Sequence, residues 1–425
     1  MSKVKNRWLI ALSGVGIHIC IGSAYAWSVF TNPMANEFGW STSEISLAFS
    51  IAIFLLGFSA AFMGKFVEKR GPRISGMLSA AFFGVGVMGT GLATAMESLL
   101  MMYFFYGLIG GIGLGIGYIA PVSTLVKWFP DHRGLATGLA IMGFGFAALI
   151  SGPVGEALVS SVGISNAFYI MGASYLVIMM GASQYLAPPP KDWKPEGMKG
   201  EAEVTPRQRK EDLSQMTANE AIKTKPFWML WTMLFLNTTA GIAIISVASP
   251  MGQQITGMSA VTAASMVGIM GVFNGFGRLG WATISDYIGR PNVYSVFFII
   301  GIISYFTLPV ITSIILFEIL VFAIVSCYGG GFSSVPAYIG DLFGTKQLGA
   351  IHGYILTAWA VAGVVGPMLL SLIYDSTKSY QLTLLIFGVM HVISLIVSLW
   401  IRLEMRKMKP GNESINTGSS SNVVP

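Results

Sequence analysis

Charged residues are scarce in this sequence. They make up 10 % of its 425 residues, whereas a typical soluble domain carries about a quarter. So few charges cannot cover the surface of a water-soluble protein of this size. The composition therefore excludes a soluble enzyme, a nucleic-acid-binding domain, a disordered chain and a collagen-like fibre. The apolar runs are unbroken rather than alternating, which also excludes an outer-membrane β-barrel.

Cysteine is nearly absent. Cys20 and Cys327 each lie in an apolar run and form no CxxC pair and no plausible metal set, so we expect them to be small core residues. The sequence also shows no nucleophile–base set and no phosphate-binding loop. We therefore expect no enzymatic activity, no cofactor, no metal and no nucleic-acid partner, although the net charge is +6.

Long apolar runs dominate the sequence. A helix needs roughly 20 mostly apolar residues to cross a bilayer. Twelve runs meet this requirement: 8–30, 44–65, 74–96, 99–127, 134–158, 165–187, 227–249, 261–284, 292–311, 314–339, 349–374 and 381–402. The first run follows three basic residues and reaches Ala24-Tyr25-Ala26, a layout similar to a signal peptide, but its length favours an uncleaved first span. The sequence predicts an all-α membrane protein with twelve transmembrane helices.

Basic residues are distributed asymmetrically between the two sides of these spans. If the N-terminus is cytoplasmic, 23 of the 25 Lys and Arg residues fall inside, Lys378 falls outside and Arg278 falls within the membrane. Positive charge in short loops marks the cytoplasmic side. We therefore expect a multi-pass protein of the cytoplasmic (inner) membrane, in contact with the lipid bilayer, with both termini in the cytoplasm.

The chain divides into two six-helix bundles. The first covers 1–187, and a charged cytoplasmic linker that begins with three prolines covers 188–225. The second bundle covers 226–402, and 403–425 is a polar tail that we expect to be disordered. Thr217-Ala218-Asn219-Glu220 has the spacing of a capping box, which predicts a short interfacial helix before the seventh span.

The two bundles share an internal repeat. Glu68-Lys69-Arg70-Gly71-Pro72-Arg73 after span 2 is similar to Asp286-Tyr287-Ile288-Gly289-Arg290-Pro291 after span 8. Three further matches recur in the same order: Trp128-Phe129 with Leu342-Phe343, Gly134 and Gly138 with Gly349 and Gly353, and Gly152-Pro153 with Gly366-Pro367. Parallel six-helix repeats are typical of transporters that rock two bundles around a central site.

These features carry a resemblance to a known family. Twelve spans, the loop from Gly64 to Arg73 with its second copy, and the Gly-Pro kink in span 5 resemble the major facilitator superfamily. Within it the sequence is most similar to the oxalate/formate antiporter family, near the monocarboxylate transporters. Three stretches carry that similarity: Gly22-Ser23-Ala24-Tyr25-Ala26-Trp27, Lys127-Trp128-Phe129-Pro130-Asp131-His132-Arg133-Gly134-Leu135-Ala136, and Phe273-Asn274-Gly275-Phe276-Gly277-Arg278. The resemblance implies the major facilitator fold, two pseudo-symmetric six-helix bundles, and a monomer.

Arg278 is the most informative single residue. It lies eight residues before Asp286, so about 12 Å from the cytoplasmic end of span 8 at 1.5 Å per residue. A charge at that depth is costly, and no Asp or Glu lies at a similar depth to pair with it. We therefore expect it to bind a substrate carboxylate through its guanidinium fork, whereas a structural ion pair is the alternative. Asn274, one turn earlier, either hydrogen-bonds the substrate or holds the arginine.

The resemblance implies that aromatic residues line the central cavity. The matching positions are Tyr25, Tyr118, Phe144, Tyr328 and Phe332. Oxalate exchangers of this family also use a lysine in span 11, and the aligned position here is Trp359. One fixed positive charge balances one carboxylate, so this departure favours a small monocarboxylate such as lactate, pyruvate, formate or acetate. An oxalate or dicarboxylate exchanger and a non-transporting carboxylate sensor on the same fold are the alternatives.

Coupling and gating give further expectations. His18 in span 1 is the candidate for a coupled proton, with a packing histidine as the alternative, and exchange against a counter-anion would need no such residue. We expect cytoplasmic ion pairs between Glu68 and Arg133 and between Asp286 and Lys346 that break during alternating access. Ordinary positive-inside charge with no gating role is the alternative for these four residues.

Overall fold

The computed structural model describes residues 5–190, 193–195 and 213–408, and all regular elements within them are helical. The predicted disordered tail from 409 onward and linker residues 191–192 and 196–212 lie outside the described residues. The helices of the first half are α1 (Arg7–Gly22), α2 (Ser28–Phe38), α3 (Thr42–Arg70), α4 (Pro72–Ala95), α5 (Leu99–Met102), α6 (Gly111–Trp128), α7 (Arg133–Val162) and α8 (Ile164–Tyr185). Those of the second half are α9 (Ala218–Ala221), α10 (Lys225–Thr256), α11 (Ala260–Ile288), α12 (Arg290–Thr307), α13 (Ile314–Phe343), α14 (Leu348–Thr377) and α15 (Gln381–Lys407).

Within the described residues, eleven helical segments are long and apolar enough to cross a membrane. The twelfth long helix is α11, which carries Arg278 and Asp286 and packs between α7 and α13. The all-helical membrane fold expected from the hydropathy pattern is confirmed. Several boundaries differ: α10 ends at Thr256, seven residues beyond the predicted end of its span, and α15 runs to Lys407, five residues beyond. The basic residues in the last turn of α15 are compatible with the helix dipole.

Two elements interrupt the regular helices. A 3₁₀ segment, Ser23–Ala26, separates α1 from α2 and contains Tyr25. A π-helical segment, Tyr103–Gly110, joins α5 to α6. Irregular turns of this kind leave backbone groups out of the normal helical pattern, and they are found disproportionately at functional positions.

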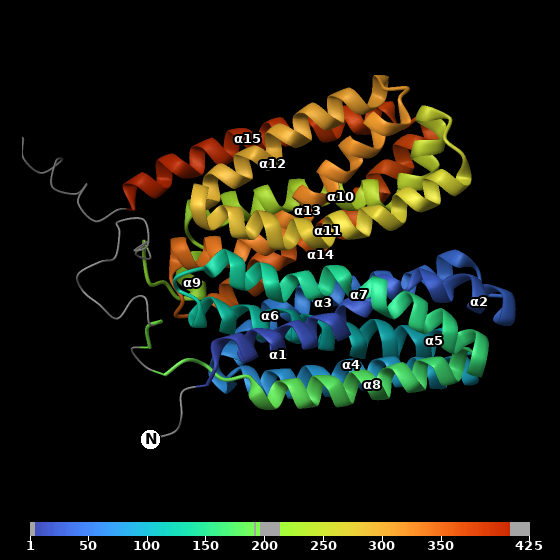
Figure 1. Ribbon diagram of the computed structural model, residues 1–425, viewed down its shortest axis with the longest axis horizontal. Coiled ribbons are helices and arrows are strands. Elements are labelled where there is room, and N and C mark those ends of the chain that lie inside the picture. Colours follow the sequence, from blue (N-terminus) through green and yellow to red (C-terminus); the bar gives the residue numbers. More distant parts are fainter. Residues whose placement is uncertain (1–4, 191–192, 196–212, 409–425) are drawn as a thin grey trace, which may run out of the picture.

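The two halves lie side by side along their length (Figure 1). Within the first half α4 packs on α8 and α1 on α7, and within the second α12 packs on α15 and α10 on α14. Across the halves, α3 packs against α14 and α7 against α11. We call the end of the molecule that holds α9 and the start of α1 the linker end, and the opposite end the far end. These two pairs are equivalent under the repeat, because α3 corresponds to α11 and α14 corresponds to α7.

The repeated glycines explain how closely these pairs approach. A Cβ placed on Gly134 would lie 1.9 Å from the carbonyl oxygen of Ala282, and a Cβ on Gly353 would lie 2.0 Å from that of Ala60. Neither distance is possible for a real side chain, so only glycine allows α7 to meet α11 and α14 to meet α3 at these crossings. The sequence repeat therefore marks two of the helix contacts between the halves.

The outer surface and the linker also match expectation. Phe62, Leu100 and Leu372 are among the large apolar side chains left exposed, as on helices that face lipid. The short helix predicted before the seventh span is confirmed as α9, with a complete capping box between Thr217 and Glu220. The backbone N–H and hydroxyl of Thr217 both donate to the Glu220 carboxylate and lower its pKa.

Candidate functional site

Arg278 is buried on α11 where this helix packs against α7 of the other half. Its side chain is 1 % exposed, and its Nε donates to Oδ1 of Asn274 at 2.9 Å. Its guanidinium carbon lies 5.7 Å from the ring centre of Phe144 and 5.6 Å from that of Phe332, so one aromatic residue from each half contacts the cation. Asn274 therefore holds the arginine side chain in this conformation. This is one of the two roles that we expected for Asn274.

The two terminal nitrogens of Arg278 lie near the Tyr25 hydroxyl and have no acidic partner among the described residues. Nη1 and Nη2 make no well-aligned hydrogen bond to the residues that the structure describes, although the Tyr25 hydroxyl lies close to the guanidinium, and no carboxylate there forms an ion pair with them. A buried cation with unsatisfied N–H groups is strongly unfavourable unless an anion pairs with it. The fork of the guanidinium is therefore available for a ligand with two adjacent acceptor oxygens.

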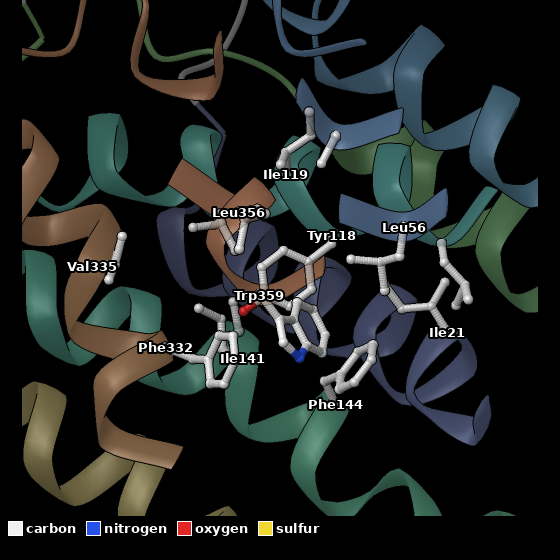
Figure 2. Close-up of a cluster of buried hydrophobic side chains, with 14 of the residues drawn as sticks. Ile21, Leu56, Tyr118, Ile119, Ile141, Phe144, Phe332, Val335, Leu356 and Trp359 are labelled. Carbon is white, nitrogen blue, oxygen red and sulfur yellow. The ribbon is translucent and has the colours of Figure 1, made fainter. Parts of the chain in front are cut away.

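The aromatic residues predicted around the cavity form one cluster with Arg278. Figure 2 shows Trp359 of α14 between Phe144, Phe332 and Tyr118. The Trp359 ring centre lies 4.7 Å from that of Phe332, 5.7 Å from Tyr118 and 6.1 Å from Phe144. Tyr25 packs edge-on against Phe144 at 4.9 Å, and Tyr328 packs against Phe332 at 5.1 Å. The structure thus brings together all eight predicted substrate-site residues.

Several hydrogen-bond donors in this cluster have no acceptor. The Tyr118 hydroxyl and the indole Nε1 of Trp359 are buried without a partner among the described residues, and the Tyr25 hydroxyl lies close to Tyr328 and Arg278 without a well-aligned hydrogen bond. Both tyrosines lie close enough to the Arg278 guanidinium to interact with it electrostatically. Together with Nη1 and Nη2 of Arg278, these groups form a buried set of donors. Such a set suits a ligand that carries only acceptors, such as a carboxylate.

His18 stacks on Tyr118, with ring centres 5.3 Å apart, and is fully buried. Its Nδ1 is 2.7 Å from the carbonyl oxygen of Ala140, and its Nε2 is 3.1 Å from that of Tyr118. A neutral imidazole has one N–H and can donate to only one of these oxygens, whereas an imidazolium donates to both. The geometry is compatible with proton binding, although a packing role would use the same contacts.

The expected ion pairs at the linker end have different partners. Glu68 lies 2.6 Å from Nζ of Lys127, not beside Arg133, and it also accepts the backbone N–H of Gly349 at 2.8 Å. Arg133 lies instead 3.3 Å from Asp341. The Glu68 carboxylate lies at the first turn of α14, where backbone N–H groups without helical partners attract an anion. It therefore points away from Arg133 at the start of α7.

Asp286 has the equivalent arrangement. It accepts the N–H groups of Gly134 and Leu135 at the start of α7, each at 2.9 Å. Its ion-pair partner is Arg290, at 2.6 Å on the next turn, and the predicted partner Lys346 is instead exposed. Each half therefore provides one acid that caps a helix N-terminus of the other half. The predicted pairings were wrong because the acids bind backbone N–H groups of the opposite half and take basic partners within their own half.

Asp341 was missed as a functional candidate, and the position of the His352 side chain between the halves was not predicted. Asp341 bonds Arg133 of the first half and Arg290 of the second, which links the halves at the linker end. Its position two residues before Phe343 in the repeat was a usable signal. His352, at the start of span 11, packs against Tyr118, but nothing in the sequence indicates that its side chain lies at the contact between the halves.

The architecture defines the class of protein. Two groups of membrane-spanning helices meet around a buried polar site, which is the arrangement of a secondary transporter. A family model described as Major Facilitator Superfamily matches residues 12–367 and 281–421, and the chain belongs to that superfamily.

Several relatives agree with this assignment. The chain is 28 % identical over 364 residues to the oxalate:formate antiporter of Oxalobacter formigenes, covering 85 % of this chain and 83 % of that protein. It is 26 % identical to monocarboxylate transporter 4 of Gallus gallus, covering 88 % and 78 %. The solved structure of the fucose:proton symporter FucP of E. coli has a TM-score of 0.69 at 14 % identity, covering 93 % and 99 %, and shares the fold. These relatives are transporters rather than enzymes, so this chain is a multi-pass membrane transporter.

Proposed function

We propose that this protein transports small monocarboxylates, of the lactate, pyruvate, formate or acetate type, across the cytoplasmic membrane. The observation that carries the proposal is the buried Arg278 fork, whose two terminal nitrogens have no acidic partner and no well-aligned hydrogen bond among the described residues. A substrate carboxylate would accept from both nitrogens, while the hydroxyls of Tyr25 and Tyr118 would donate to its remaining lone pairs. Phe144, Phe332 and Trp359 would enclose the apolar part of the substrate.

The charge of the site supports a monoanion. Within the aromatic cluster Arg278 is the cation, and Trp359 occupies the span 11 position that the family resemblance aligns with a lysine of oxalate exchangers. A dianion would bring one uncompensated charge into a low-dielectric site, which is unfavourable. Exchange of oxalate is the second candidate, favoured by the similarity to the oxalate:formate antiporter.

Alternating access would move the substrate across the membrane. Hydrogen bonds between the halves gather at the linker end, where Glu68 meets Gly349, Asp286 meets Gly134 and Arg133 meets Asp341. We infer that this conformation is closed at the linker end, which the basic residues assign to the cytoplasm together with both termini. Rocking of the halves would break these contacts and open the site to the cytoplasm.

Coupling is proposed to be either proton symport or anion exchange. In the symport reading His18 would hold the proton, because two carbonyl oxygens are in place to accept from an imidazolium. In the exchange reading a second anion would occupy Arg278 during the return step, and His18 would only pack against Tyr118.

Transport of labelled lactate and labelled oxalate into proteoliposomes tests the proposal. Uptake is measured for the wild type and for Arg278→Ala and Arg278→Lys, with and without an inward proton gradient. We expect gradient-stimulated lactate uptake in the wild type and its loss in Arg278→Ala. Oxalate uptake driven only by internal anion would favour the exchanger. Absence of uptake of both anions, with no ligand-induced thermal stabilisation, would contradict the carboxylate assignment.

A further inference from the structure

His352 is a buried titratable residue whose side chain makes no hydrogen bond to the part of the chain that the structure describes. It lies on α14, is 0 % exposed, and neither Nδ1 nor Nε2 has a partner among the described residues. Buried polar side chains nearly always find partners, and a lone imidazole with both nitrogens unpaired needs a specific explanation. In this conformation no hydrogen bond from the described residues stabilises either the neutral or the charged form of the His352 imidazole.

The imidazole lies at the contact between the halves. Its ring centre is 5.9 Å from that of Tyr118, which belongs to α6 of the opposite half. The neighbouring residue Gly353 packs against the backbone of Ala60 in α3, and Gly349, one turn earlier, binds Glu68. His352 is therefore enclosed by the same helix contacts that close the linker end.

The charged and titratable groups around His352 offer no compensation for an imidazolium. They are His18 of α1 and Tyr118 of α6, with Arg278 of α11 close enough to His18 to interact with it electrostatically, and Glu68 of α3 and Lys127 of α6 toward the linker end. Glu68 is the acid among these groups, and it is already bound to Lys127 and to the N–H of Gly349. A proton on His352 in this conformation would create a buried, unpaired charge.

His18 provides an internal contrast. It is equally buried, but its two nitrogens face carbonyl oxygens of α6 and α7, which belong to the same half as α1. Rocking of the halves as rigid bodies leaves those contacts in place. The contacts of His352 with Tyr118 instead cross between the halves, so its surroundings change with the conformation.

We propose that His352 is a proton-binding site that is closed in this conformation and becomes accessible to water when the linker end opens. Protonation then favours the open linker end, because an imidazolium is solvated there and unpaired here. The proposal rests on the alternating access proposed above, but it does not depend on which anion is carried. In the expected orientation, an acidic cytoplasm would hold the transporter open to the inside.

The expected effect can be worked out from linkage. If His352 titrates with the ordinary imidazole value of about 6.5 in the open state and stays neutral in the closed state, lowering the pH from 7.5 to 5.5 raises the ratio of open to closed molecules about tenfold. A larger change would require a second titrating group, and no change would mean that His352 stays enclosed.

The experiment measures the opening of the linker end directly and without substrate. Spin labels at Lys69 of α3 and Lys225 of α10, both exposed and on opposite halves, report the distance between the halves in a Cys20→Ala, Cys327→Ala background. Distance distributions are recorded in proteoliposomes between pH 7.5 and 5.5 for the wild type, His352→Leu and His352→Gln. His391→Gln is the matched control, because His391 is buried within the second half and its Nδ1 lies 2.9 Å from the Phe387 carbonyl oxygen.

We expect the open population of the wild type and of His391→Gln to rise about tenfold on acidification, and both His352 variants to lose this response. Two variants are used so that a folding defect in one, detected by its melting temperature, leaves the other informative. An unchanged pH response in a folded His352 variant would overturn the proposal, as would a wild type whose opening does not depend on pH. A failure to transport carboxylates would contradict the proposed function and leave this result intact.

Discussion

The two acids that cap helices across the halves should contribute unequally to closing the linker end. Asp286 accepts two backbone N–H groups of the first half, at 2.9 Å each, and its side chain is 9 % exposed. Glu68 accepts one N–H group of the second half, at 2.8 Å, and its side chain and that of Lys127 are 15 % and 25 % exposed. Neutralising Asp286 should therefore open the linker end more than neutralising Glu68.

The magnitudes follow from the number of bonds that cross between the halves. A hydrogen bond to a charged group contributes about 1.5–3 kcal/mol, against about 1 kcal/mol for a neutral one. Asp286→Asn keeps one acceptor oxygen and loses the charge, so we expect a loss of about 2 kcal/mol, or about 30-fold in the opening equilibrium. Glu68→Gln loses the charge on a single, more solvated bond, so we expect about 1 kcal/mol or less, about fivefold.

The same pair of spin labels at Lys69 and Lys225 measures both variants at pH 7.5. Glu404→Gln serves as the control, since Glu404 pairs with Lys407 within α15 and that lysine side chain is 70 % exposed. An effect of Glu68→Gln as large as that of Asp286→Asn would refute the reasoning from cross-half bonds. No effect of either substitution would mean that the helix contacts alone close this end.

Three further outcomes are expected. Arg278→Lys keeps the charge but loses the fork, so the apparent substrate affinity in the uptake assay should fall about tenfold or more, and equal affinity would contradict bidentate binding. Trp359→Lys adds a second cation, so uptake of oxalate relative to lactate should rise about tenfold, whereas Trp359→Leu should leave that ratio low. Gly353→Ala should lower the melting temperature by forcing α14 from α3, at a cost of about 1–3 kcal/mol. Gly280→Ala, where a Cβ would meet nothing within 4 Å, is the control, and equal melting temperatures would disprove the steric reading.

The spans, the repeat and the buried arginine could be predicted from the sequence because each depends on local properties. Hydropathy over about 20 residues determines which segments enter a bilayer, and the capping box of α9 lies within four residues. An arginine inside an apolar span is recognisable from the sequence, because a charge buried in the membrane is costly and therefore rare. The predicted roles of the site residues stay predictions, although the structure brings those residues together.

The partners across the halves depended on the tertiary structure. Glu68 and Gly349 are separated by 281 positions in the chain, and Asp286 and Gly134 by 152. Which groups meet over such separations depends on the rotation and crossing of whole helices, which close Gly–backbone contacts determine. Charge counting therefore identified the correct acids but assigned them side-chain partners, whereas the structure directs both toward helix N-termini. The same packing decided that Asn274 holds Arg278 and that His352 lies without a partner, among the described residues, between the two halves.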